Sequence, residues 1–121
     1  MTKYLLNSAV ITTPGVYEYH IITPEQARAW YGNGAGVVST IGYEETASAL
    51  SYLLGSPVAV NRVTIKMNKG DEALVFRLVL PPGSPRIDPK DKGQIMQHVS
   101  AGHWELGLLR KIGIEGGWMG E

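Results

Sequence analysis

The stretch best suited to chemistry runs from residue 37 to residue 55, where a short apolar strand is followed by a turn and a helix. The turn is Ser39-Thr40-Ile41-Gly42, and Tyr43 then precedes the acidic pair Glu44 and Glu45. A strand, a glycine-containing turn and a helix N-terminus bring free backbone N–H groups to one point, which can bind a phosphate or another anion. An ordinary strand-to-helix connection has the same pattern, so both interpretations stay open.

Three further residues could belong to such a site. Asn7 interrupts an apolar strand, where asparagine is disfavoured, and either a bulge or a ligand contact would explain it. Arg62 follows Asn61 early in a predicted strand, where a long cation needs solvent, a carboxylate or a ligand phosphate. Of these three partners for Arg62, the carboxylate of an ion pair is slightly favoured. Tyr43 could stack on a base, donate its hydroxyl or pack in the core.

No pattern of metal-dependent or nucleophilic catalysis is present. His20, His98 and His103 have no metal-ligand spacing and are each interpreted as structural or neutral. No Ser-His-Asp arrangement or nucleophile elbow occurs, and the carboxylates form no evident acid/base pair. The absence of cysteine excludes disulfides and thiolate metal sites. We therefore expect neither a metal nor a cofactor.

Composition limits the partners. The 121 residues fit one domain, and 11 basic side chains balance 11 acidic ones, so no positive field favours long nucleic acid. A small nucleotide with few phosphates remains compatible. No apolar run approaches the roughly 18–20 residues of a membrane span. We expect a soluble cytoplasmic protein without membrane or long nucleic-acid partners.

The first part of the chain predicts a hairpin and a capped helix. Residues 3–13 are rich in β-formers, Pro14-Gly15 is a turn signal, and residues 16–21 alternate like a returning strand. Thr23 then acts as an N-cap, with Pro24 at the first helical position and Gln26 completing a capping box. This helix ends before the glycine-rich residues 32–36.

The second part predicts a central helix and another hairpin. Ala47, Leu50, Leu53 and Leu54 form one apolar stripe, and Gly55 is placed to end the helix. Residues 58–67 and 72–80 read as two strands joined by an Asn68-Lys69-Gly70-Asp71 turn.

The last part predicts a loop, a helix and a strand. Residues 81–85 form an exposed proline-rich loop that could act as a lid, a helix starts at Asp88-Pro89, and residues 103–112 form the final strand. The fold class is α+β, a mixed and largely antiparallel sheet of about five strands with two to three helices. Residues 1–121 are one domain, with 113–121 as a frayed tail.

Several motifs occur together, in one order and at one spacing. They are Tyr4-Leu5-Leu6-Asn7-Ser8, Ser39-Thr40-Ile41-Gly42-Tyr43-Glu44-Glu45-Thr46-Ala47, Leu53-Leu54-Gly55, Asn61-Arg62-Val63 and Gly70-Asp71-Glu72-Ala73-Leu74-Val75. Over about residues 3–110 the chain thereby resembles the viral ring nucleases that act as type III anti-CRISPR proteins, with their bacterial and prophage relatives of unassigned function. The resemblance implies a small α+β homodimer that holds a cyclic oligoadenylate, usually cyclic tetra-adenylate, across the subunit interface. It also implies, for active members, metal-independent cleavage in which a ribose 2′-hydroxyl attacks its own phosphate and a histidine protonates the leaving oxygen.

The chain departs from this pattern at the catalytic positions. Ile41-Gly42-Tyr43 stands where the family has Ile-Gly-His, and Val79-Leu80-Pro81-Pro82-Gly83 stands where it has Arg-x-x-Glu-Gly. Tyrosine, with a reference pKa of about 10, is a much weaker acid than histidine at neutral pH. Loss of a general acid typically costs about 10²–10⁴-fold in rate.

The resemblance implies a set of ligand-binding residues, and the proline-rich loop described above is the candidate lid. The ligand-binding set is Asn7, Ser8, Ser39, Thr40, Ile41, Gly42, Tyr43, Thr46, Asn61 and Arg62, and the lid loop contains Pro82, Gly83, Ser84 and Arg86. We therefore expect a dimeric binder that sequesters a cyclic oligonucleotide messenger and blunts antiviral defence signalling. One alternative is an active metal-independent ring nuclease that uses Tyr43, or a histidine, on a different cyclic nucleotide. Another is an interaction protein without a ligand, since fold alone does not fix function.

Overall fold

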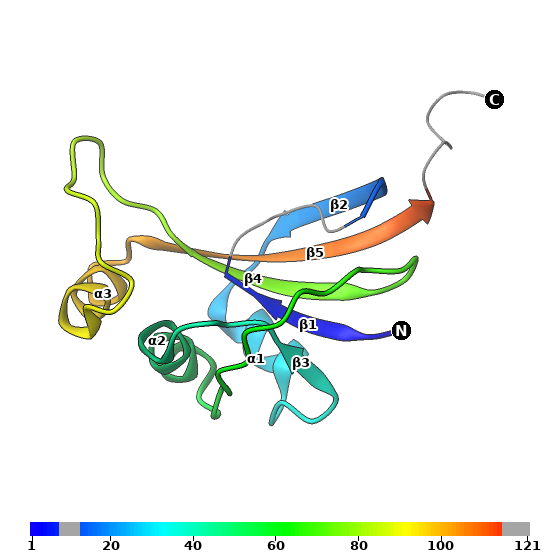
Figure 1. Cartoon of the computed structure of the whole chain (residues 1–121), viewed down its shortest axis with the longest axis horizontal. Helices are drawn as coiled ribbons and strands as arrows, with labels where there is room; N and C mark the ends of the chain where they lie inside the picture. Colours follow the sequence, from blue (N-terminus) through cyan, green and yellow to red (C-terminus); the bar gives the residue numbers. More distant parts are fainter. Residues whose placement is uncertain (8–12, 115–121) are drawn as a thin grey trace.

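The computed structural model describes residues 1–7 and 13–114 (Figure 1). The elements confirm the expected α+β class, with five strands and three helices in one chain. They are, in order, β1 (Lys3–Leu6), β2 (Gly15–Ile21), α1 (Pro24–Tyr31), β3 (Val37–Ser39), α2 (Glu44–Leu54), β4 (Glu72–Leu78), α3 (Lys92–Ser100) and β5 (Trp104–Ile114). None of these three helices combines the length and apolar character that crossing a membrane requires.

The strands form one mixed sheet in the order β2-β5-β4-β1-β3. β1 is parallel to both of its neighbours, β3 and β4. β5 is antiparallel to both β4 and β2, and these are the longer pairings. Two of the predicted strand pairings are therefore wrong, although the number of strands and the mixed character of the sheet are confirmed.

The first error is the hairpin between residues 3–13 and 16–21. β1 ends at Leu6, and β2 pairs with β5 at the other side of the sheet. Leu5 and Leu6 are consecutive and both buried, so β1 is covered on both faces and lies between two strands. The remainder of the predicted first strand, residues 8–12, lies outside the described residues.

The second error is the hairpin between residues 58–67 and 72–80. Both sides of β4 are already occupied, by β1 and β5, and residues 58–67 form no strand. Instead this segment, here called the crossing segment, begins on the helix side, where Val58 packs against the core, and ends on the opposite face of the sheet, where Met67 is fully buried and Ile65 packs beside it. Val60 and Val63 are 49% and 45% exposed and belong to no strand, although valine favours strands. Arg62 therefore lies in an extended loop and not in a strand.

The turn before β4 exists without a hairpin. The Asp71 carboxylate accepts hydrogen bonds from the backbone N–H groups of Asn68 and Thr2, each at 2.8 Å. Gly70 N–H donates to the carbonyl of Lys111 in β5 at 2.8 Å. These contacts lead the crossing segment directly into a central strand.

Local helix signals are confirmed. Thr23 and Gln26 form the reciprocal capping box of α1, and Gly55 ends α2 in the left-handed conformation with φ of 68°. α3 begins at Lys92 with Asp91 as its N-cap, later than the predicted start at Asp88-Pro89. β5 continues to Ile114, so residues 113 and 114 belong to a strand and not to a tail.

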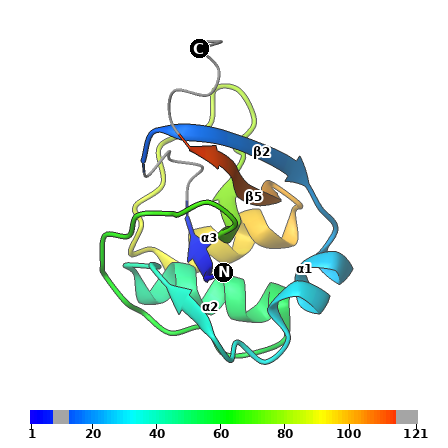
Figure 2. The same ribbon diagram turned by 90° about the vertical axis from the view of Figure 1, so that its right-hand side faces the viewer.

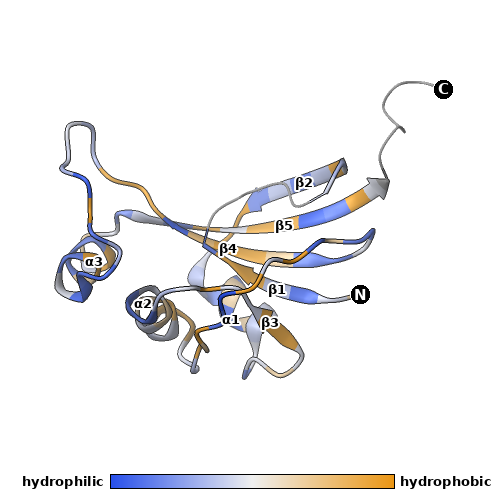
Figure 3. Ribbon diagram, viewed as in Figure 1, coloured by the Kyte–Doolittle hydropathy of each residue, from blue (hydrophilic) through white to orange (hydrophobic). Residues whose placement is uncertain are grey.

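The core has two parts, one on each face of the sheet. Leu5, Leu74, Phe76 and Leu106 pack against the helices, which all lie on one side (Figure 2). Leu6, Ala73, Val75 and Leu109 pack against Met67 on the other face. Apolar residues are concentrated in the middle of the sheet, in β1 and β4 (Figure 3). This anchors the ends of β1, β3 and β4 at the site described next.

Candidate ligand-binding site

The candidate site lies at the carboxyl ends of three parallel strands. β1 is the middle one, and Asn7 follows it directly; β3 lies on one side and leads into α2, and β4 lies on the other. In open sheets, ligands bind outside the carboxyl ends of parallel strands where the chain leaves to opposite sides. In the arrangement β4-β1-β3, three parallel strands present their carboxyl ends side by side.

The turn after β3 is fixed by its own hydroxyl groups. Thr40 donates to the Leu5 carbonyl from its backbone N–H at 3.0 Å and from its hydroxyl at 2.7 Å. Ser39 is buried; its hydroxyl donates to the Ala59 carbonyl at 2.6 Å and accepts from the Ile41 N–H at 3.2 Å. Both side chains hold the turn in place, because their hydroxyl protons are already used within the protein.

The crossing segment supports the same turn from outside. The Asn61 side-chain amide donates to the Ser39 carbonyl at 2.9 Å, and its backbone N–H donates to the Ile41 carbonyl at 2.9 Å. The Arg62 guanidinium donates to the Gly42 carbonyl at 3.1 Å and lies 4.9 Å from the centre of the Tyr43 ring. An added Cβ on Gly42 would lie 3.3 Å from Arg62 Nε, which is a tight contact.

The favoured ion-pair interpretation of Arg62 is therefore wrong within residues 1–7 and 13–114. Its guanidinium contacts a carbonyl and an aromatic ring, and it pairs with no carboxylate of that part of the chain. The side chain is exposed, so it can also be approached from solvent.

The N-terminus of α2 opens toward this site. Tyr43 is its N-cap residue and makes no side-chain capping hydrogen bond. The first-turn N–H groups of Glu44, Glu45 and Thr46 accordingly find no acceptor among the described residues. The half-buried Tyr43 likewise has no described hydrogen-bond partner for its hydroxyl. The helix end thus carries a positive partial charge that no described side chain caps by a hydrogen bond.

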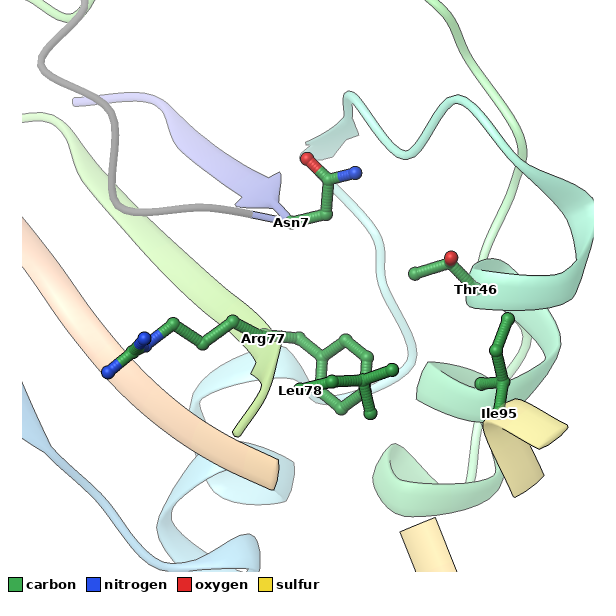
Figure 4. Close-up of a pocket in the computed structure, with 6 residues that line it drawn as sticks. Asn7, Thr46, Arg77, Leu78 and Ile95 are labelled. Atoms are coloured by element: carbon green, nitrogen blue, oxygen red, sulfur yellow. The ribbon is translucent and has the colours of Figure 1, made fainter. Parts of the chain in front are cut away.

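A pocket of about 170 Å³ lies beside this helix end (Figure 4). Asn7 and Thr46 lie across it from one another, and Ile95 approaches from α3. Phe76 and Leu78 contribute apolar surface from β4. The pocket thus combines an amide, a hydroxyl and an apolar wall, as small-ligand sites do.

Arg77 also lines this pocket, and the sequence interpretation missed it. Its guanidinium points toward β5, where it makes two hydrogen bonds of 3.0 Å to Glu105 (Figure 4). The Tyr19 hydroxyl donates to the same carboxylate at 3.0 Å. A cation inside the apolar run of residues 73–80 was the signal that could have revealed it, since a strand interior rarely holds an unexplained arginine.

Charge in this cluster is mutually compensated. The hydrogen bond from Arg77 is the main cause that lowers the pKa of the Glu105 carboxyl. Burial, and then the hydrogen bond to Glu105, raises the pKa of Tyr19. Glu105 therefore stays ionised and holds the Arg77 guanidinium against β5, directed away from Asn7 and Thr46.

The structure brings most of the predicted binding residues together. Of these residues, Asn7 and Thr46 line the pocket. Asn61 and Arg62 are hydrogen-bonded to the turn at 39–42, which leads into Tyr43 and α2, and none of these residues is among those that line the pocket. The Ile41 side chain is fully buried in the core, so only its backbone can face a ligand. Ser8 lies outside the described residues.

The predicted lid does not line the pocket in this structure. Pro82, Gly83 and Arg86 are exposed in the β4–α3 connection, which projects from one end of the molecule (Figure 1). Ser84 is half-buried, and its N–H donates to the Pro81 carbonyl at 3.1 Å. Closure of this loop stays a prediction.

Comparison with known proteins fits this architecture. Residues 3–84 match the STIV B116-like family. The chain belongs to that family. Its relatives include uncharacterized proteins of bacterial and viral origin, so the family is shown, whereas the ring-nuclease function that the sequence implies stays a prediction.

Two relatives and one solved structure define the similarity. The uncharacterized protein YddF of Bacillus subtilis (strain 168) is 38% identical over 74 residues, which cover 60% of this chain and 68% of YddF. The uncharacterized protein ORF117 of Acidianus two-tailed virus is 35% identical over 79 residues, covering 62% and 68%. B116 of Sulfolobus turreted icosahedral virus superposes with a TM-score of 0.67 at 20% identity, over 91% of this chain and 99% of B116. The last comparison supports the fold alone.

Proposed function

We propose that this B116-like protein binds a cyclic oligonucleotide second messenger as a homodimer and sequesters it, with little or no ring opening. In an infected cell such a sponge would blunt antiviral defence signalling. The observation that carries the proposal is the placement of Asn7 and Thr46 beside the uncapped N-terminus of α2. An amide, a hydroxyl and free N–H groups are suited to a ribose phosphate.

The size of the pocket supports a dimer. About 170 Å³ is below the range of roughly 300–1,000 Å³ typical of small-molecule sites, whereas a cyclic oligonucleotide is a large ligand. A symmetric second copy would double every donor around one ring. The ligand would then lie across the two-fold axis, with one pocket from each protomer.

Tyr43 supports binding over cleavage. Its ring can stack on a base, and the resemblance described above implies a histidine as the proton donor where Tyr43 stands. Phenol is a poor general acid at neutral pH because its reference pKa is about 10. The alternative is an active nuclease that uses the Tyr43 hydroxyl, and it would release linear products instead of the intact ring.

The test is incubation with a panel of cyclic oligonucleotides, followed by analysis of free, heat-released and cleaved ligand. We expect depletion of one ring from solution and its intact recovery on heating. Linear products would establish the enzyme, and no depletion by any ring would leave an interaction protein.

Matched variants connect the result to the pocket. Thr46→Val removes the hydroxyl at nearly constant volume, and Asn7→Ala removes the amide. Each should weaken binding by about 1–3 kcal/mol, the scale of a lost hydrogen bond in a binding site. Thr64→Val is the control, because Thr64 is exposed and does not line the pocket. Equal binding by all three variants would remove this pocket from the account.

A further inference from the structure

We propose that a hollow at the amino end of β4 binds a free L-amino acid with an apolar side chain. The hollow has a volume of about 320 Å³, within the roughly 300–1,000 Å³ typical of small-molecule sites. Its walls include Glu18 of β2, Lys69 of the turn before β4, and Arg110, Lys111 and Ile112 of β5. The candidate site described above lies at the carboxyl end of β4, so the length of this strand, about 20 Å, separates the two (Figure 1).

The strand register places the charged groups of the hollow. Arg110 is the register partner of both Glu18 in β2 and Glu72 in β4. Its guanidinium nitrogens lie 4.0 Å from the Glu18 carboxylate and 3.9 Å from the Glu72 carboxylate, which is beyond hydrogen-bond distance. The Trp30 indole donates to Glu72 at 2.8 Å and holds that carboxylate in place. Two carboxylates therefore position the Arg110 guanidinium, but no hydrogen bond within the described part of the chain uses its N–H groups.

Lys69 adds a second available cation. It is exposed in the turn before β4, and its ammonium pairs with no carboxylate of the described residues. The buried Lys111 ammonium, by contrast, already donates to the Thr13 hydroxyl at 2.7 Å and to the Met67 carbonyl at 3.2 Å. The hollow thus offers two available cations and the one carboxylate of Glu18.

The two charged groups of an α-amino acid match this arrangement. Its ammonium nitrogen and its nearer carboxylate oxygen are about 3 Å apart, as standard bond lengths require. Across the 4.0 Å gap, the ligand carboxylate would accept from Arg110 while the ligand ammonium donates to Glu18, each at about 2.7–2.9 Å. Lys69 would donate to the second carboxylate oxygen. A simple anion would instead be repelled by Glu18, so the ligand carries both charges.

Ile112 determines the class of side chain. It is 43% exposed and forms part of the wall of the hollow. An apolar side chain of the ligand would remove this surface from water, which is favourable in proportion to the apolar area buried. A charged side chain would lose hydration there without an opposite charge to compensate it.

Calorimetric titration with L-leucine, L-methionine and L-phenylalanine tests the proposal. We expect saturable binding of at least one of them, with one site per chain. The N-acetyl form of that amino acid lacks the ammonium charge, and its methyl ester lacks the carboxylate charge. Each blocked form should bind at least about tenfold more weakly, because it loses a charge-assisted hydrogen bond.

Charge-removing variants connect binding to the hollow. Glu18→Gln and Lys69→Ala should each weaken amino-acid binding about tenfold or more. Glu25→Gln and Lys66→Ala are the matched controls, because Glu25 and Lys66 are exposed and line no part of the hollow. Circular dichroism checks the folding of each variant. Lys69→Ala decides the outcome if Glu18→Gln does not fold, since it changes only an exposed turn.

Three results would each overturn the proposal. The first is the absence of saturable binding by all three amino acids. The second is equal binding of the free amino acid and its blocked forms. The third is an affinity that falls as much in the control variants as in Glu18→Gln and Lys69→Ala. None of these results depends on whether the protein binds a cyclic oligonucleotide, because the two sites lie at opposite ends of β4.

Discussion

Arg62→Ala tests whether the guanidinium holds the turn before α2. The side chain makes one hydrogen bond, to the Gly42 carbonyl at 3.1 Å, and one cation–π contact with Tyr43 at 4.9 Å. An exposed cation–π contact contributes about 0.5–1 kcal/mol, and a hydrogen bond about 0.5–1.5 kcal/mol net. Because Arg62 is exposed, we take the lower part of both ranges and expect the free energy of unfolding to fall by about 1 kcal/mol.

The assay is urea denaturation at constant protein concentration, with thermal unfolding as a second measure. For a chain of this length, about 1 kcal/mol corresponds to a decrease in Tm of about 3–5 °C. Lys66→Ala is the matched control, since it removes an exposed cation from the same segment and should change stability by less than about 0.5 kcal/mol. Gly42→Ala should imitate Arg62→Ala, because the added methyl group displaces the guanidinium.

Ligand affinity separates this role from a direct phosphate contact. If Arg62 instead binds a phosphate, Arg62→Ala should weaken ligand binding by about 1.5–3 kcal/mol and leave unfolding unchanged. Equal stability of Arg62→Ala and Lys66→Ala would therefore refute the positioning role.

Three further predictions follow from other contacts. Gly107→Ala should destabilise the fold by about 1–3 kcal/mol in urea titrations, because the added methyl group would overlap the Tyr19 ring. Gly93→Ala should instead stabilise α3 by about 0.5–1 kcal/mol, because the atom nearest to its methyl group would be 3.6 Å away. Equal effects of the two variants would contradict the packing argument. Folding lowers the pKa of Glu105, so the contribution of this carboxylate to the free energy of unfolding is present above its unfolded pKa of about 4.3 and is lost as the pH falls below that value. The difference in stability between wild type and Glu105→Gln should therefore shrink from about pH 7 to about pH 3. A difference that stays constant with pH would argue against the ion pair. If the Tyr43 ring stacks on a base, Tyr43→Ala should weaken ligand binding by about 1–3 kcal/mol and Tyr43→Phe should weaken it less. Loss of turnover in Tyr43→Phe would instead indicate catalysis. Tyr43→His should give at most slow cleavage.

Local signals predicted the helices well, because their causes lie within a few residues. The capping box of Thr23 and the glycine after α2 each satisfy backbone groups of their own helix, so the sequence is sufficient to place them. Strand pairing depends on distant partners. β2 would satisfy its hydrogen bonds equally well beside any antiparallel strand, and only the buried pair Leu5 and Leu6 indicated that β1 is central.

The candidate site was predicted in part for the same reason. Asn7, Thr46 and the turn at 39–42 lie at strand ends and at a helix start, positions that a sequence pattern indicates. Arg77 was missed because its partner, Glu105, is 28 residues away in a neighbouring strand. The contact between Arg62 and Gly42 was likewise invisible, since it requires the segment 58–67 to cross the sheet instead of joining it.

Native mass spectrometry of the protein incubated with cyclic oligoadenylates tests the central claim most directly. The account predicts a complex of two chains with one intact ring, unchanged in mass after prolonged incubation. It also predicts that Thr46→Val reduces the fraction of this complex, whereas Thr64→Val does not. Conversion of the bound ring to linear products would contradict the account. A monomeric chain that binds no ring of any size tested would contradict it as well.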